Sequence, residues 1–290
     1  MTPRRDPRLI FVASALCFAF MAVAAKVASR TMPGEVVAFF RFSLMLAPFA
    51  LRPALARTAL TWERGDLLVY RGVFGGTAVL LYFLAIEHVP VGLATLLNYS
   101  SPIWAVLFAA LFLGERARPV LLVPFALALV GMVLVTGALN DPQHPFRLGT
   151  WEAAGLLSSV LSGAAVASIR AARRSESSWS IYGSFTLCGL LVTAPFAAPK
   201  LRWPSGSEGL LLLAVGLASV GAQLLMTYAY RWVNNLQAGI YAQITVVAAM
   251  ALGVFLLGER FAPSQLAGAA LAIAGVIGVI ALQAPPRPIV

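Results

Sequence analysis

The chain has 290 residues, of which 60% are hydrophobic and only 11% are charged. A soluble domain is about a quarter charged, so this composition does not suit one water-exposed globule of ~250–300 residues. It excludes a soluble enzyme, a nucleic-acid-binding module and a disordered chain, and it indicates an integral membrane protein in contact with the lipid bilayer. The net charge of +10 then belongs to the loops of a membrane protein and not to a nucleic-acid surface.

Ten apolar runs are each close to the ~20 residues that a helix needs to cross ~30 Å of hydrocarbon. Short breaks containing Pro and Gly separate them, as at Pro33-Gly34 and Pro204. Nine runs follow the first, so we interpret the first as a span and not as a cleaved signal peptide. The runs lie near 9–30, 34–51, 67–87, 91–113, 119–139, 150–170, 178–197, 209–230, 236–257 and 263–282.

Basic residues gather at alternate ends of these runs. A cytoplasmic amino terminus places most of the 21 Lys and Arg residues on the cytoplasmic side. We therefore predict that both termini lie in the cytoplasm.

The second half of the chain repeats the first at one constant shift. Residues 113–116 and 257–260 both read Leu-Gly-Glu-Arg, and with a small adjustment the Ala-Pro-Phe-Ala of 47–50 recurs at 194–197. Each copy holds five spans, an odd number, so the second copy enters the membrane inverted. We expect an all-α membrane protein with two domains, 1–139 and 140–290, whose ten transmembrane helices form two inverted five-helix repeats around a central cavity. Inverted repeats are typical of secondary transporters, which bind near the bilayer midplane.

The segments 85–135 and 229–279 each resemble the EamA domain of the drug/metabolite transporter superfamily. Arg41 and Pro102 match positions of that family, but Val246 stands where the second copy would have the proline, so a matching helix break there is not predicted. The chain is most similar to the ten-span bacterial exporters of amino acids and metabolites, including aromatic amino-acid exporters of the YddG type. The resemblance implies a multi-pass protein of the bacterial cytoplasmic (inner) membrane.

Three charges fall inside the runs, and all are basic. Lys26 and Arg71 lie near span ends and are interpreted as residues that snorkel to the two membrane surfaces. Arg41 lies ~10 Å below Gly34 at 1.5 Å per residue, and it either satisfies carbonyls of a neighbouring helix or faces the pathway. The acids lie at span ends or in loops, which disfavours a proton-coupled exporter of cationic drugs. A neutral or zwitterionic solute, carried by a facilitator or exchanger, is expected.

Two of those acids lie in the repeated turns. Glu115 and Glu259 are expected to accept hydrogen bonds from the first amides of the helix that follows each of them.

Polar and aromatic side chains recur on the third, fourth, sixth, eighth and ninth runs. Trp104 is the only tryptophan in mid-span, where it offers a flat apolar surface to a solute. Packing between helices is the alternative role for the serines. The expected substrate-binding residues are Tyr82, Asn98, Tyr99, Ser101, Trp104, Ser158, Ser162, Gln223, Thr227, Tyr241 and Gln243, with Arg41 as the candidate pathway charge.

These features predict a secondary transporter that exports amino acids, neutral and aromatic ones included, or similar small metabolites by alternating access. A drug or nucleotide-sugar carrier of the same superfamily is the alternative, and an intramembrane enzyme is a remote one. The sequence shows no catalytic motif, and its two cysteines lie in apolar runs, so no catalytic residue, metal or other cofactor is expected. Both repeats share one chain, so a monomer is expected to suffice.

Overall fold

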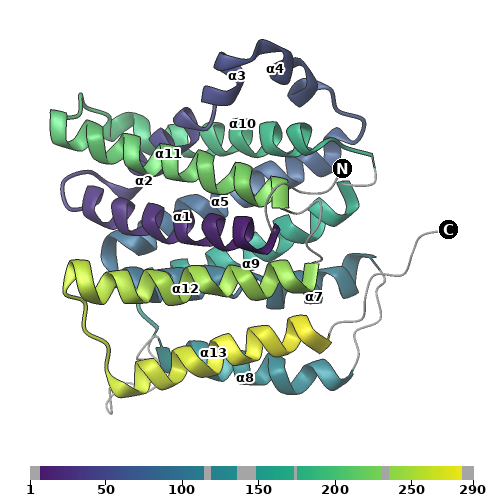
Figure 1. Ribbon diagram of the computed structural model, residues 1–290, viewed down its shortest axis with the longest axis vertical. Coiled ribbons are helices and arrows are strands. Elements are labelled where there is room, and N and C mark those ends of the chain that lie inside the picture. The colour runs from purple at the N-terminus through teal and green to yellow at the C-terminus, as the bar shows by residue number, and fades with distance from the viewer. Residues whose placement is uncertain (1–6, 114–118, 136–147, 173–174, 230–234, 283–290) are drawn as a thin grey trace.

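A computed structural model describes residues 7–113, 119–135, 148–172, 175–229 and 235–282 (Figure 1). Over these ranges the chain is helical and contains no strand. The helices are α1 (Pro7–Ala28), α2 (Gly34–Leu44), α3 (Ala47–Leu51), α4 (Pro53–Leu60), α5 (Gly65–His88), α6 (Val91–Tyr99), α7 (Ser101–Leu113), α8 (Leu122–Val135), α9 (Thr150–Ala172), α10 (Ser178–Ala197), α11 (Gly206–Ala229), α12 (Asn235–Leu257) and α13 (Pro263–Leu282), with short 3₁₀ turns η1 (Pro119–Leu121) and η2 (Ala198–Lys200).

Eight helical segments are long and apolar enough to cross a membrane, and two shorter apolar helices cover 119–135 and 241–257. The structure differs from the ten predicted runs in two places. The second run ends in the short helix α3, which begins near Pro48, and a further short helix, α4, begins at Pro53 after the run. The fourth run is divided into α6 and α7.

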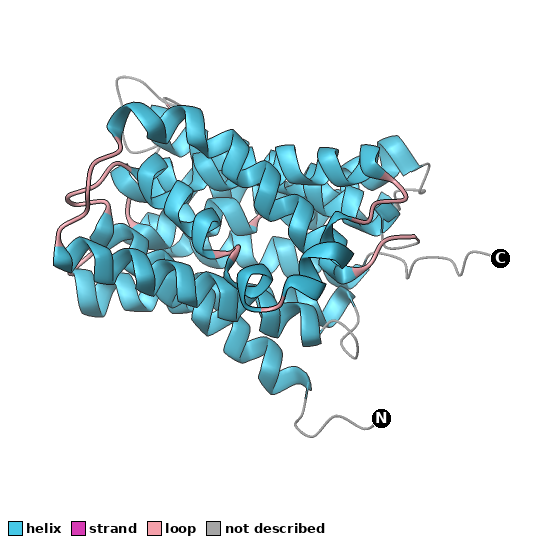
Figure 2. Cartoon of the chain, turned by 90° about the horizontal axis from the view of Figure 1, so that it is seen from above, coloured by secondary structure: helices cyan, strands magenta, loops and turns pink. Residues whose placement is uncertain are grey.

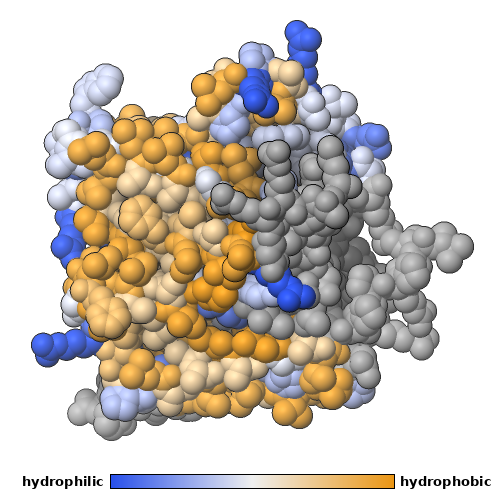
Figure 3. Space-filling view, viewed as in Figure 1, coloured by the Kyte–Doolittle hydropathy of each residue, from blue (hydrophilic) through white to orange (hydrophobic). Residues whose placement is uncertain are grey.

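The long helices lie side by side in one bundle, seen in both views (Figures 1 and 2). α8 packs on α13 at one edge of the bundle, while α1 packs on α11 and α5 packs on α9 and α10. The visible face is mainly hydrophobic (Figure 3). Side chains such as Phe255 and Leu191 are 84% and 71% exposed, which suits contact with lipid tails instead of water.

Glycines bring these helices into close contact. A Cβ on Gly131 of α8 would lie 2.3 Å from the backbone nitrogen of Ala272, and a Cβ on Gly275 of α13 would lie 2.4 Å from that of Ala128. Small residues are used in this way where membrane helices gain stability from packing and not from burial out of water.

Carboxylates cap helix ends across the bundle. Glu87 accepts from the amide of Gly34 at 2.7 Å at the start of α2, and Glu176 accepts from the amide of Arg64 at 2.6 Å at the start of α5. Glu259 accepts from the amide of Val91 at 2.6 Å at the start of α6. Each carboxylate thus lies where the helix dipole favours negative charge.

The expectation for Glu259 was therefore wrong in one respect. It caps α6 of the other half of the chain and not α13, which follows it. Gly258 takes a φ of +69° and lets the chain reverse there, so the carboxylate reaches a different helix. Glu115, its equivalent in the first copy, lies outside the described residues.

The glycine contact between α8 and α13 can be tested by one added methyl group. Gly131→Ala should lower the stability of the purified protein by ~1–3 kcal/mol, because its Cβ meets the α13 backbone. Gly209→Ala in α11 is the matched control, since nothing lies within 4 Å of the added Cβ. Thermal unfolding in detergent measures both, and equal melting temperatures would contradict the packing described.

Candidate functional site

A cavity of ≈ 200 Å³ lies among nine helices of the bundle. Helices α1, α2, α5, α6, α7, α9, α10, α11 and α12 contribute side chains, whereas the peripheral pair α8 and α13 is not part of its lining. Aromatic and aliphatic groups make most of its wall, as Phe11, Phe185 and Val166 do. Apolar walls with a few polar groups are typical of small-molecule sites.

The cavity lies in the half of the bundle that carries the amino end of α1. Its lining comes from the early part of α1 and α5, as at Phe11 and Arg71, and from the late part of α9 and α11, as at Val166 and Met226. These segments meet at the same end because α1 and α5 run opposite to α9 and α11.

Five of the residues expected from the sequence line this cavity: Arg41, Tyr99, Ser101, Ser162 and Gln223. Six others lie outside its lining: Tyr82, Asn98, Trp104, Ser158, Tyr241 and Gln243. The side chain of Thr227 lies outside the described residues. The binding of substrate by any of them stays a prediction.

Most of the six join helices around the cavity. The Tyr82 hydroxyl lies 2.9 Å from the Thr95 hydroxyl, which joins α5 to α6, and the Asn98 amide donates to Ser158 of α9. The Trp104 indole donates to the Ser159 hydroxyl at 2.8 Å. These hydrogen bonds fix helix positions, and polar groups inside a membrane bundle are commonly used this way.

The other two, Tyr241 and Gln243, lie on α12. The ring of Tyr241 packs 6.1 Å from that of Phe11, which lines the cavity, and the amide of Gln243 donates to the carbonyl of Tyr99 at 3.3 Å.

The break between α6 and α7 lies beside the cavity. Pro102 has no amide hydrogen to donate, and the amide of Ile103 turns to the carbonyl of Ser100 at 3.1 Å. This turn leaves the Tyr99 carbonyl to accept from Gln243. In α12, Val246 stands at the position of Pro102, and the helix continues through it. Only the first copy is therefore interrupted, which exposes irregular backbone where it lines a cavity.

Arg41 is 5% exposed, and its contact with a neighbouring helix is to a hydroxyl and not to the carbonyls expected from the sequence. Its Nε donates to the Ser219 hydroxyl of α11 at 3.1 Å, and its guanidinium lies 5.4 Å from the ring centroid of Phe42 and 5.6 Å from that of Phe83. It also lines the cavity. Arg41 thus contacts a neighbouring helix and presents charge to the interior.

Arg71 also lines the cavity and is partly exposed, so its interpretation as a residue that snorkels to the surface stays a prediction. Its guanidinium lies 4.3 Å from the ring centroid of Phe185, and its buried Nε has no hydrogen-bond partner. The side chain lies against Gly75 one turn later, where a Cβ would come 2.0 Å from Nη1. Gly75 has no side chain, which makes room for the arginine. A glycine four residues after Arg71 was therefore a sequence signal for this position of the side chain.

Lys26 lies at the opposite end of the bundle and bonds to protein there. Its ammonium donates to the carbonyls of Glu87 at 3.1 Å and Val89 at 2.9 Å, at the end of α5. A cation at this position is favoured by the helix dipole.

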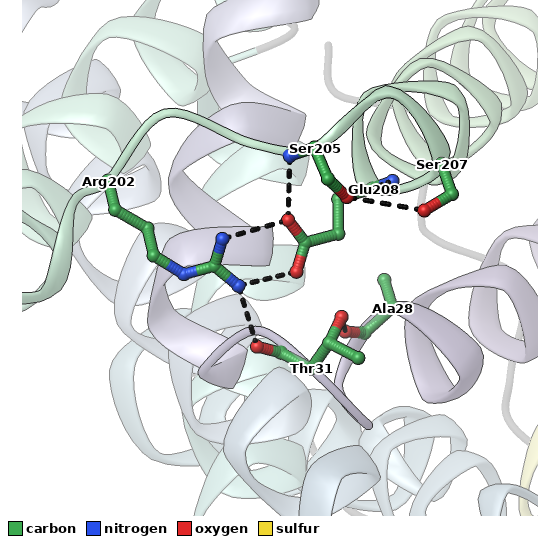
Figure 4. A network of polar contacts seen from close by, with 6 residues as sticks. All are labelled: Ala28, Thr31, Arg202, Ser205, Ser207 and Glu208. Carbon is green, nitrogen blue, oxygen red and sulfur yellow. Dashed lines mark hydrogen bonds and ion pairs between the residues drawn. The ribbon is translucent and has the colours of Figure 1, made fainter.

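A polar network joins the two halves of the chain at that same end (Figure 4). Arg202 donates to both carboxylate oxygens of Glu208 and to the Thr31 carbonyl at 3.2 Å, and the amide of Ser205 donates to Glu208 at 2.8 Å. The hydrogen bond to Glu208 raises the pKa of Arg202 above its ordinary value. Lys200 pairs with the buried Glu35 nearby.

A bundle of long apolar helices around a small cavity is the architecture of a multi-pass membrane protein. The model of the EamA-like transporter family matches residues 8–137 and 149–281, so the chain belongs to this family.

Relatives named as exporters agree with this family. The pseudopaline exporter CntI of Pseudomonas aeruginosa is 32% identical over 226 residues, 77% of each chain. The aromatic amino acid exporter YddG of Ancylobacter novellus is 29% identical over 204 residues, 68% of each chain. One crystal structure with 22% identity has a TM-score of 0.62 and covers 95% of this chain and 96% of its own, which shows a shared fold.

The contact between Trp104 and Ser159 predicts a coupled effect on stability. Ser159→Ala should cost ~1–3 kcal/mol, because the indole N–H is left without an acceptor. In a Trp104→Phe background the same change should cost much less, since no N–H remains. Thermal unfolding of the two single variants and the double variant measures the coupling. Additive losses would show that the hydrogen bond does not hold α7 to α9.

Proposed function

We propose that this chain is a secondary transporter that exports amino acids or similar small metabolites across the cytoplasmic membrane by alternating access. The observation that carries the proposal is the ≈ 200 Å³ cavity, which helices from both halves of the chain line together. A site at the junction of two halves can be exposed to one side and then the other when the halves rock.

Reciprocal contacts support an inverted repeat of 1–139 and 140–290. In the two copies α1 corresponds to α9, and α5 corresponds to α11. The contact of α1 with α11 is therefore equivalent to the contact of α9 with α5, and both are present. The α8–α13 contact is likewise reciprocal, with Gly131 on Ala272 and Gly275 on Ala128. A two-fold relation between the copies produces contacts of this kind.

The two ends of the bundle support alternating access. The cavity lies toward the amino end of α1, which we place on the cytoplasmic side with both termini. At the other end, Lys200–Glu35 and Arg202–Thr31 join the second half of the chain to the first. We interpret this arrangement as a state in which the outer end is closed, and export requires these contacts to separate.

Cavity size and relatives both favour a small metabolite. A volume of ≈ 200 Å³ is below the ~300–1,000 Å³ usual for drug-sized ligands, which favours amino acids over the drug or nucleotide-sugar alternative. The relatives named as exporters of pseudopaline and of aromatic amino acids fit the export of small metabolites. The pathway lies within one chain, so a monomer is sufficient.

Blocking the cavity tests this proposal. Val166→Trp should reduce transport of labelled amino acids to the level of protein-free liposomes, because Val166 lines the cavity and an indole fills much of it. Leu157→Trp is the control, since Leu157 is on the same helix, is 49% exposed and does not line the cavity. The assay is counterflow in liposomes that contain only the purified protein.

Three results bear on the proposal. Loss of counterflow in Val166→Trp with normal counterflow in Leu157→Trp supports it. Normal counterflow in both variants would move the pathway elsewhere. No counterflow of any metabolite by the parent protein would contradict transport itself.

A further inference from the structure

Two positive charges, the buried Arg41 and the partly exposed Arg71, share one cavity. Arg41 and Arg71 both line it, and neither forms an ion pair within the part of the chain that the structure describes. Glu35 and Glu208 pair instead with Lys200 and Arg202 at the opposite end of the bundle. A cation held inside a membrane bundle is costly, so its presence indicates a functional role.

Two phenylalanine rings connect the two guanidinium groups. The ring of Phe42 lies 5.4 Å from Arg41 and 5.3 Å, edge to face, from the ring of Phe185, which lies 4.3 Å from Arg71. The rings hold the arginines on one wall of the cavity. A guanidinium over an aromatic ring is held by the cation–π attraction, and its planar N–H groups can still form a fork with an oxyanion.

We propose that this cavity binds a small organic anion with two carboxylates, one for each of Arg41 and Arg71. The proposal rests on the transport function above and names its substrate class. Charge-assisted, bidentate hydrogen bonds to carboxylate are the interactions for which arginine is best suited. The Ser101 and Ser162 hydroxyls on the cavity wall add neutral hydrogen bonds.

A neutral amino acid would leave the positive charge of this site only partly neutralised. Its carboxylate would pair with one arginine, but its ammonium would enter a cavity that already holds two cations. A dicarboxylate neutralises both guanidinium groups when it binds and restores their mutual repulsion when it leaves. The proposal therefore departs from the expectation, drawn from the position of acids in the sequence, that the solute is neutral or zwitterionic.

Ligand-induced shifts of the melting temperature test the charge of the substrate. The probes are glutarate, L-glutamate, L-glutamine and glycerol 3-phosphate, added to the purified protein in detergent. Glutamate and glutamine have nearly the same shape and differ in one charge. Glutarate and glutamate should half-saturate the protein at concentrations ~10-fold or more below that of glutamine, since charged hydrogen bonds are about twice as strong as neutral ones.

Variants of Arg71 separate binding from folding. Arg71→Gln removes a cation that has no acidic partner among the described residues, so without ligand it should melt at the parent temperature or above, yet it should lose the shift caused by glutarate. Arg71→Lys keeps the charge and should retain part of the shift. Arg57→Gln, on the exposed face of α4, is the matched control and should respond to glutarate as the parent does.

Several outcomes would overturn the proposal. Equal half-saturation by glutamate and glutamine, an unchanged glutarate shift in Arg71→Gln, or no binding by any dicarboxylate would each do so. Binding of glycerol 3-phosphate alone would assign the site to a phosphate ester instead. Liposome counterflow keeps the two proposals apart: transport of neutral amino acids without dicarboxylate binding overturns only this inference, whereas dicarboxylate binding without transport overturns only the transport function.

Discussion

Hydrocarbon offers no hydrogen bonds, so every helix end and every charge in this bundle must be satisfied by the protein or its ligand. Glu176 and Glu259 cap helices of the first half from the second half, which holds the two halves together. These bonds use acids at the two ends of the bundle, and neither glutamate lines the cavity. Arg41 and Arg71 consequently line the cavity as charges without an acidic partner in the part of the chain that the structure describes. One constraint thus determines both the assembly of the bundle and the charge of its cavity.

Close packing between some of the helices determines where the cavity lies between the others. Glycine contacts bring α8 onto α13 and, through Gly76 and Gly189, α5 onto α10. The break before Pro102 and the room beside Gly75 occur where α5, α6 and α7 meet the cavity. Tightly packed and open regions therefore alternate within one bundle, and a transporter needs both, because its halves must move as rigid bodies around a site that can hold a solute.

Much of this structure follows from sequence pattern, since apolar length alone predicts membrane helices. The short helix α4 was missed because Pro53 starts it inside a loop too polar to read as a span. The partner of Glu259 was assigned wrongly because a capping contact between distant helices leaves no local signal. The orientation of Arg71 depends on Phe185 of α10, a tertiary contact that helix periodicity does not specify. Local sequence patterns thus predict the helices, whereas contacts between the two halves of the chain determine the arrangement of the site.

An experimental structure of the purified protein saturated with glutarate tests the central claim most directly. The account predicts ligand density in the cavity, with carboxylate oxygens ~2.7–2.9 Å from the guanidinium nitrogens of Arg41 and Arg71. It also predicts that Phe185 stays against Arg71. An empty cavity at saturating glutarate, or a carboxylate of the protein itself bound to both guanidinium groups, would contradict it.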